Sequence, residues 1–309
     1  MAKKIIIIGA GVAGLSSGIF AQKAGYETII YEKNAVPGGE CIGWDREGCH
    51  IDGCIHWLTG TNPSNSLYKI WCETGALGED IEVIETPEFM VLDLGHKTLP
   101  LHKDMDKLKK LFAEIAPEDQ KELKKLYRAI EAAAQQKIPL HPVEQMNPVE
   151  LGKLLVSGIR SSMFMKNFQL SAEEYLKRFK SEELKFLLQS ILPYGCRADI
   201  LAFILGTVMS GNGGRPRGGS LAMAQRMAQR YEELGGKIIF NTRVKKIIVE
   251  DNCGRGIELE GKNGVETASA DWIIPACDVH ITQHKLLENK YPLKEFDERD
   301  AAPGTYPCS

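Results

Sequence analysis

The stretch that decides the fold is KIIIIGAGVAGLSSGIFAQKAGYETIIYE, from Lys4 to Glu32. It begins with Ile5 to Ile8, an unbroken β-branched run that is typical of a parallel strand buried on both faces. Three glycines follow at G-x-G-x-x-G spacing, and Val12 to Ala24 has the apolar period of a helix that stops at Gly25. The stretch therefore predicts the strand, glycine turn, helix and second strand of a dinucleotide-binding unit.

Each of the three glycines has its own expected task. Gly9 allows the tight turn out of the strand, Gly11 lets a diphosphate approach the backbone, and Gly14 lets the helix pack closely on the strand. Val12 and Ala13 form the helix N-terminus, whose unpaired N–H groups and partial positive charge suit a diphosphate. We therefore predict cofactor contacts at these five positions.

The second strand, from Thr28 to Tyr31, ends on Glu32, which lies 32 − 9 = 23 positions after Gly9. A carboxylate about 20 residues after the first glycine is where the ribose hydroxyls of an adenosine half are held. It would also repel a 2′-phosphate, which disfavours NADP. The alternative is a glycine-rich turn in some other α/β fold, but strand, spacing, helix and acid would then have to coincide.

Composition excludes several classes of function. The chain has 309 residues, 43% of them hydrophobic, which is enough for one large or two modest cores. Its formal net charge of −3 gives no basic field for nucleic acid, so no nucleic-acid partner is expected. The eight cysteines form no C-x-x-C pair and are predicted to stay thiols in a reducing compartment. With no signal peptide and no apolar stretch of bilayer length, a cytoplasmic location is predicted.

The segment from Lys33 to Gly60 is dense in glycine and poor in helical or strand period, which is typical of a loop wrapped against a ligand. Its Gly38-Gly39 pair, followed by Ile51-Asp52-Gly53 and His56-Trp57, resembles the phytoene desaturase, retinol saturase and amine oxidase group of FAD-dependent oxidoreductases. In that group the loop runs beneath the FAD diphosphate and ribityl chain. The resemblance implies cofactor contacts from Lys33, Gly38 and Gly39, with His56 and Trp57 close to the flavin. A purely structural glycine-rich loop is the alternative.

Glu40 departs from the family, which commonly has arginine after the Gly-Gly pair. A carboxylate about 4 Å from a phosphate charge would cost ~1 kcal/mol in water and ~4 kcal/mol at a protein-surface dielectric. Glu40 belongs to the predicted cofactor loop. We nevertheless expect its carboxylate to turn away from the phosphates, with Arg46 as one partner. Weaker cofactor binding is the alternative.

Between Pro87 and Ser210 the pattern is mostly helical, and in the family the substrate-facing cap comes at this point. The sequence predicts a short helix at Leu67–Leu77, strands at Ile81–Ile84 and Phe89–Leu94, charged helices between Met105 and Lys137 broken at Pro117, an amphipathic helix at Glu173–Leu188, a break at Leu192–Gly195 and a buried helix at Ile200–Met209. Leu151 to Leu170 is rich in Leu, Met and Phe. Core packing, lining for a lipophilic substrate and contact with a membrane surface are its three alternatives.

The α/β pattern resumes at the glycine-rich Gly211–Ser220. The expected elements are a helix capped by Ser220 and ended by Gly235-Gly236, a strand at Lys237–Phe240, a hairpin of Val244–Val249 with Arg255–Leu259, and a strand at Asp271–Ile274. This order matches the second FAD segment of the family. The resemblance implies that the backbone of Val244 meets the adenine and that Ala276 returns the chain to the cofactor.

Two pairs of polar residues carry weaker hypotheses. Arg215 and Arg217 can neutralise a substrate carboxylate or a diphosphate, or lie in a solvated loop. His280 and His284 stand at i, i+4, which places two imidazoles on one helix face. No third ligand accompanies them, so no metal site is predicted.

The combined prediction is an α/β fold, with a Rossmann-like FAD-binding domain and a mostly helical inserted substrate or cap domain. Residues 1–86 and 211–283 are assigned to FAD binding, 87–210 to the cap and 284–309 to an incomplete return segment. Because the family continues with a further sheet and a closing glycine-rich segment, the chain is expected to lack a C-terminal half. The alternatives are a truncated open reading frame, a fragment, and one half of a split enzyme whose missing C-terminal half would be a partner.

The resemblance implies hydride transfer between FAD and a lipophilic substrate, forming or reducing a C=C bond. The flavin carries this chemistry, and the sequence nominates no catalytic side chain. Two alternatives remain at this point. One is an amine or amino-acid oxidase on the same fold, and the other is a non-catalytic binding protein, as in the dissociation inhibitors of small GTPases.

Overall fold

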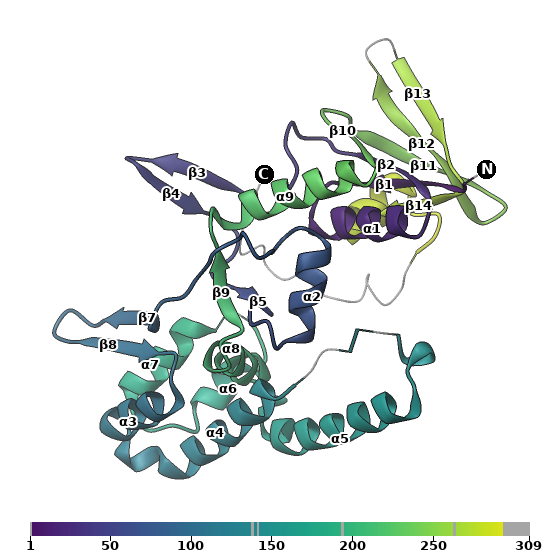
Figure 1. Cartoon of the computed structure of the whole chain (residues 1–309). Coiled ribbons are helices and arrows are strands. Elements are labelled where there is room, and N and C mark those ends of the chain that lie inside the picture. The colour runs from purple at the N-terminus through teal and green to yellow at the C-terminus, as the bar shows by residue number, and fades with distance from the viewer. Residues whose placement is uncertain (1, 137–138, 141, 193–194, 262–263, 293–309) are drawn as a thin grey trace. The chain divides into compact units, whose positions relative to one another are not determined.

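A computed structural model of the chain describes residues 2–136, 139–140, 142–192, 195–261 and 264–292 (Figure 1). The chain divides into two compact units. The first contains Met1–His56, Ile70–Glu82 and Pro216–Ser309, and the second contains Trp57–Lys69 and Val83–Arg215. Pro193 and Tyr194, in the expected break after Leu192, lie outside the described residues, as does the end of the chain from residue 293.

The first unit is built on a four-stranded parallel sheet in the order β10-β2-β1-β14. Its strands are β1 (Lys4–Ile8), β2 (Glu27–Tyr31), β10 (Lys237–Ile239) and β14 (Trp272–Pro275). Helix α1 (Val12–Lys23) joins β1 to β2, and β2 pairs with β1 from Lys4 opposite Glu27 to Ile8 opposite Tyr31. The strand, turn, helix and strand predicted from Lys4 to Glu32 are therefore confirmed.

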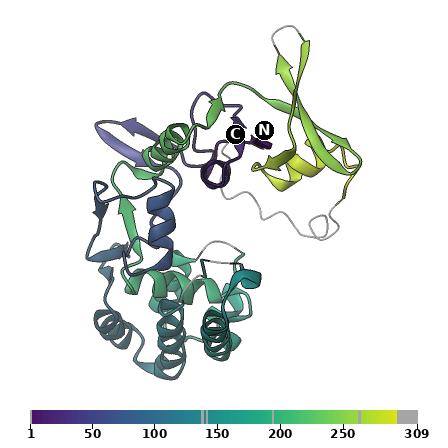
Figure 2. The same ribbon diagram turned by 45° about the vertical axis from the view of Figure 1, so that its right-hand side comes forward.

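Both faces of this sheet are covered. On one face, Ile6 and Ile8 share a core with the antiparallel sheet of β11 (Val244–Glu250), β12 (Cys253–Gly261) and β13 (Gly264–Ser269), and with the π-helical turn η4 (Ile281–Leu286) (Figure 2). On the other face lie α1 and α9 (Gly219–Glu233) (Figure 1). There Gly18 lets α1 approach closely, because an added Cβ would lie 2.7 Å from the ring of Tyr231.

The segment from Lys33 to Gly60 contains a hairpin, so the expectation that it lacks strands is wrong. Strand β3 (Gly43–Arg46) pairs antiparallel with β4 (Cys49–Asp52). The turn between them places Glu47 at φ 51° and Gly48 at φ 81°, the two left-handed residues of a tight hairpin turn. Most side chains of this hairpin are exposed or only half-buried, which explains why no apolar alternation marks its strands.

The second unit is mostly helical. Its main elements are β5 (Leu58–Thr59), β6 (Val83–Ile84), β7 (Glu88–Asp93), β8 (Thr98–His102), α3 (Met105–Ile115), α4 (Gln120–Ala134), α5 (Pro148–Met165), α6 (Ala172–Leu176), α7 (Glu182–Ile191), α8 (Asp199–Met209) and β9 (Gly213–Pro216), which ends one residue beyond the unit. Its core is formed by leucines of α3, α4, α7 and α8 with Phe112, Phe168 and Tyr175. The buried helix predicted near α8 is confirmed, whereas the strand expected at Ile81–Ile84 shrinks to β6. Helix α2 (Ser66–Glu73) crosses the boundary between the units in sequence.

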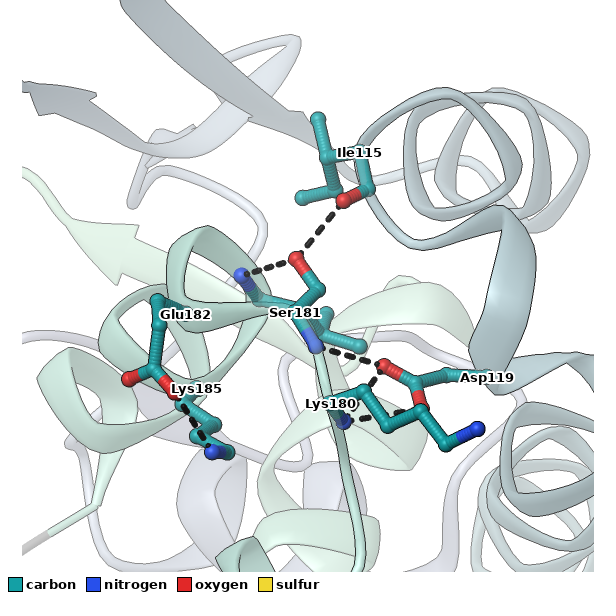
Figure 3. A network of polar contacts seen from close by, with 7 residues as sticks. Ile115, Asp119, Lys180, Ser181, Glu182 and Lys185 are labelled. Atoms are coloured by element: carbon teal, nitrogen blue, oxygen red, sulfur yellow. Dashed lines mark hydrogen bonds and ion pairs between the residues drawn. The ribbon is translucent and has the colours of Figure 1, made fainter.

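One predicted helix in this unit is two. The expectation of a single helix at Glu173–Leu188 is wrong, because residues 177–181 separate α6 from α7. The buried carboxylate of Asp119 accepts hydrogen bonds from the backbone N–H groups of Lys180 at 2.9 Å and Ser181 at 3.0 Å (Figure 3). The Ser181 hydroxyl then accepts from Leu184 N at 3.2 Å and so caps α7.

Helix α5 does not bury most of its apolar residues. Val156 and Ile159 are 68% and 69% exposed, and Val149 and Leu155 are also exposed. The described apolar side chains of this helix therefore do not form a core, whereas Phe168 just beyond it is buried and Leu170 packs against the core of the second unit. In the described part of the chain, no helix combines the length and the apolar character needed to cross a membrane.

Candidate dinucleotide-binding site

The glycine turn after β1 is held too tightly for side chains. Gly9 has φ +103°, a left-handed conformation that glycine adopts without strain, and its N–H donates to Tyr31 O at 2.8 Å. A Cβ on Gly14 would lie 2.0 Å from Gly9 O, so the first turn of α1 packs directly on the turn. The packing tasks predicted for Gly9 and Gly14 thus have a direct geometric basis.

Gly11 differs from its two neighbours in the motif. Its φ is −73°, and a Cβ there would meet nothing closer than 3.9 Å, at Gly38 O and Gly39 Cα. The fold itself therefore does not require glycine at this position. Gly11 is the N-cap of α1, whose described first turn, beginning with Val12 and Ala13, carries no side-chain cap and no acidic residue. The open space beside free helix N–H groups fits an anionic group such as a diphosphate.

The Gly38-Gly39 turn lies against the glycine turn, 27 residues away from Gly11 in sequence (38 − 11). Gly38 N donates to Ala10 O at 2.9 Å, and Gly38 forms a parallel bridge with Gly11. Gly38 and Gly39 both have positive φ, at 124° and 61°. The structure therefore brings the Gly38-Gly39 pair into contact with the glycine turn of the G-x-G-x-x-G motif.

Glu32 lies at the end of β2 and is only 4% exposed. One carboxylate oxygen accepts from Ala10 N at 2.8 Å, and the other accepts from Asn34 N at 2.9 Å. Each oxygen has about two acceptor sites, so each could accept one further hydrogen bond. Sequence reasoning missed the first task of Glu32, which is to hold the glycine turn, because its partners are backbone groups.

Ala276 and Val244 both adjoin this region. Ala276 N donates to Ile8 O at 2.9 Å, and Ala276 O would lie 3.1 Å from a Cβ on Gly9. The side chain of Val244 is buried in the core with Ile6 and Ile8. Contacts from either residue to a cofactor remain a prediction.

Glu40 and Lys33 are both exposed. Among the described residues, Glu40 forms no ion pair with Arg46, whose Nε lies 3.9 Å from the carboxylate of Glu47. The suggested pairing of Glu40 with Arg46 is therefore absent from this structure. Whether Glu40 faces the cofactor stays a prediction.

Asp52, in the Ile51-Asp52-Gly53 motif, fastens the loop to α9. Ser220 was expected to cap this helix, but the N-cap is Gly218, and the carboxylate of Asp52 accepts from Ser220 N at 2.6 Å and Ser220 Oγ at 2.7 Å. Burial would raise the pKa of Asp52, but hydrogen bonds from Ser220, Cys54 and Ile55 outweigh burial and lower it. No sequence signal indicates this contact between residues 168 positions apart.

The remaining candidates are spread over the two units. His56 ends the first segment of the first unit, and Trp57 begins the second unit, where it packs edge-to-face on Phe89 with ring centroids 5.4 Å apart. Their approach to a flavin stays a prediction. Arg215 belongs to β9 in the second unit, whereas Arg217 belongs to the first.

Arg217 has a protein partner, because its Nε lies 2.5 Å from Glu82 Oε2, and this hydrogen bond raises the pKa of Arg217 and lowers that of Glu82. The rings of His280 and His284 stack at 5.6 Å. Within the described ranges, no three His, Cys, Asp or Glu side chains are grouped to hold a metal ion.

A parallel strand, glycine turn, helix and strand, with a buried carboxylate at the end of the second strand, define a dinucleotide-binding α/β protein. Residues 12–306 match the family described as flavin containing amine oxidoreductase, and the chain belongs to this family. The family resemblance predicted from the glycine motifs is thereby confirmed. The name of the family specifies flavin as the cofactor.

The named relatives are distant. The chain is 25% identical over 298 residues to phytoene desaturase (lycopene-forming) of Pseudescherichia vulneris, which covers 92% of this chain and 58% of that protein. It is 25% identical over 279 residues to all-trans-retinol 13,14-reductase of Rattus norvegicus, covering 84% and 44%. Cyclohexylamine oxidase from Brevibacterium oxydans IH-35A shares the fold, with a TM-score of 0.58, 16% identity and coverage of 94% and 61%. The chain thus spans about half the length of these curated relatives.

Proposed function

We propose that the chain binds FAD as part of an oxidoreductase that transfers hydride between the flavin and a lipophilic substrate, forming or reducing a C=C bond. The observation that carries this proposal is the space beside Gly11. A Cβ there would meet no protein atom closer than 3.9 Å, so the protein leaves room at this position for a diphosphate. A 2′-phosphate beside the buried carboxylate of Glu32 would be repelled, which favours FAD over a cofactor carrying that group.

The residues divide the work of binding. The N-terminus of α1 holds the diphosphate with the N–H groups of Val12 and Ala13. Glu32 orients the ribose, and the Gly38-Gly39 turn leaves the backbone open to the cofactor. When bound, the flavin supplies the redox chemistry by accepting or donating hydride. In this proposal residues 1–86 and 211–283 bind the cofactor, and residues 87–210 face the substrate.

The lipophilic substrate class rests on two supports. The relatives are named for phytoene and retinol, both of which are lipophilic molecules. In the second unit, an open groove of about 500 Å³ lies between α4 and α5, with Ala132, Val149, Gly152 and Val156 in its lining. Apolar residues exposed beside such a groove suit an apolar molecule.

Gly11→Ala should separate folding from cofactor binding. We expect the urea midpoint to stay near that of the unchanged chain, because the added methyl would meet protein atoms only at 3.9 Å, an ordinary van der Waals distance that needs no rearrangement. The affinity for FAD should fall about tenfold or more, which corresponds to a loss of ~1.4 kcal/mol. Flavin absorbance and fluorescence during titration with FAD measure the affinity.

Gly158→Ala is the matched control for this variant, because it adds the same methyl in open space on α5. It should bind FAD like the unchanged chain. The proposal fails if the unchanged chain binds no flavin, or if Gly11→Ala binds it equally well. Peroxide release with amine substrates, and none with retinoids or carotenoids, would assign the amine oxidase alternative instead.

We further propose that α5 contacts a lipid surface, from which an apolar substrate would be drawn. Its exposed apolar residues include Leu155, Val156 and Ile159. This region carries the exposed lysines Lys153 and Lys166 but one acidic residue, Glu150. This excess of positive charge favours anionic lipids.

The chain is therefore expected to sediment with vesicles that contain phosphatidylserine. The double variant Val156→Glu, Ile159→Glu should lose most of this binding, because it places charges on the apolar face. Val91→Glu, at a valine that is 56% exposed on β7, is the matched control and should keep it. Wild-type protein that remains in the supernatant, or equal sedimentation of the two variants, contradicts the lipid contact.

A further inference from the structure

Cys41 and Cys54 stand opposite each other at the base of the β3–β4 hairpin. Gly43 pairs with Asp52 in the antiparallel register, and one step outward Gly53 N donates to Ile42 O at 2.9 Å. One further step places Cys41 across from Cys54, because the residue numbers of each opposite pair sum to the same value. Opposite residues in such a pair have Cα atoms about 4.5 to 5.5 Å apart, within the range that a disulfide spans.

The two side chains meet. Their sulfur atoms are 3.9 Å apart, and both cysteines are free thiols. Cys41 is 6% exposed, whereas Cys54 is only half-buried and is the one that a small oxidant can reach. The backbone here is already fixed, since Cys41 N donates to Gly38 O at 3.0 Å and Cys54 N donates to Asp52 Oδ1 at 2.9 Å. Forming the bond therefore needs mainly side-chain rotation.

We propose that Cys41 and Cys54 are a redox site that forms a reversible intramolecular disulfide with peroxide as the oxidant. The sulfur of Cys54 attacks one peroxide oxygen, the O–O bond breaks, and a sulfenic acid on Cys54 and one water result. The sulfur of Cys41 then attacks the Cys54 sulfur and displaces the hydroxyl group as a second water. The two thiol hydrogens end in the waters, the sulfurs are oxidised by two electrons, and the peroxide is reduced. A dithiol reductant reverses the bond by exchange.

The consequence lies in the cofactor loop. The disulfide would join the end of β4 to the turn that carries Gly38 and Gly39, and this turn packs on the glycine turn through Gly38 N and Ala10 O. The hairpin would then be closed by a covalent bond at its base. This inference does not depend on FAD, because it concerns only contacts within the loop and hairpin.

The surroundings make the oxidation slow at neutral pH. Burial raises the pKa of Cys41 to about 12, and burial also raises that of Cys54. The neighbouring carboxylates of Asp52 and Glu40 disfavour both thiolates further. For Cys54 alone, hydrogen bonds with the Cys41 thiol and the Ser220 hydroxyl lower the pKa and oppose this in part. Since the thiolate is the nucleophile, the rate should rise roughly tenfold per pH unit below the pKa of Cys54.

The test uses Cys49→Ser as the background. Trypsin cleavage after Arg46 leaves Cys41 on one peptide, residues 34–46, while Cys49 and Cys54 share the next, residues 47–69. In the variant, a link between these peptides can arise only from Cys41 and Cys54. The protein is treated with hydrogen peroxide at about pH 7 and about pH 9, alkylated, digested and analysed by mass spectrometry. We expect the linked pair to appear, faster at the higher pH, and to vanish after dithiothreitol.

Two further variants in the same background decide the assignment. Cys54→Ser should abolish the link, with its fold checked by circular dichroism. Cys253→Ser, at an exposed cysteine in β12, should leave the link unchanged. Absence of the linked pair at both pH values, or a link from Cys41 to any other cysteine, overturns the proposal.

Discussion

Gly14→Ala is expected to lower the free energy of unfolding by about 3 kcal/mol, at the upper end of the cost of overpacking a core. The added methyl would lie 2.0 Å from Gly9 O and 3.3 Å from the Cβ of Ala276. The first of these atoms belongs to the backbone and cannot rotate away, so α1 has to separate from β1. Urea denaturation followed by circular dichroism measures the loss.

Gly158→Ala serves again as the comparison. It also lies in a helix, but no atom would lie within 4 Å of its Cβ. Because alanine favours helix by about 0.5 to 1 kcal/mol over glycine, this variant should be unchanged or slightly stabilised. Equal midpoints for the two variants would show that β1 and α1 are not packed as closely as described. Gly11→Ala completes the series, since it should cost affinity for FAD but little stability.

Glu32→Ala is expected to lower the free energy of unfolding by about 3 kcal/mol and to abolish flavin retention. The buried N–H of Ala10 would lose its acceptor, which costs ~1–3 kcal/mol. The hydrogen bond from the N–H of Asn34 would also be lost. The proposed ribose contact is removed at the same time. Denaturation and flavin content per protein are measured on the same preparation.

Glu32→Gln divides the two effects. Glutamine keeps one oxygen acceptor but presents an amide NH₂ group to the second N–H, so an intermediate loss of stability is expected. Glu27→Gln, at an exposed residue of β2, the strand that Glu32 follows, should change neither property. If Glu32→Ala unfolds like the unchanged chain, Glu32 does not hold the glycine turn. If it keeps full flavin content, Glu32 does not bind the ribose.

The sequence was most informative where chemistry is local. The isoleucine run, the glycine spacing and the acid at residue 32 predicted the β1–α1–β2 unit and its family, because each depends on neighbours along the chain. The helix α8 was predicted for the same reason, since an apolar run of its length is longer than a typical buried strand and indicates a buried helix.

Contacts between distant segments could not be predicted. Asp119 breaks a helical pattern 61 residues away by accepting from Lys180 N, and Asp52 replaces Ser220 as the capping group of α9. Neither partner is marked by spacing or composition. The β3–β4 hairpin was missed for another reason. Its turn pair, Glu47-Gly48, is not one of the favoured hairpin pairs such as Asn-Gly or Asp-Gly, and its exposed strands have no alternating pattern.

The strand order of the parallel sheet has a consequence for synthesis on the ribosome. Strands β1 and β2 come from the first 31 residues, but their outer partners β10 and β14 begin at residues 237 and 272. Both edges of the β1–β2 pair therefore stay open while more than half of the chain is translated. The second unit, whose longest segment is continuous from Val83 to Arg215, is complete before β10 emerges. The nascent chain thus has to keep an isoleucine-rich strand pair from associating with other chains until its last strand arrives.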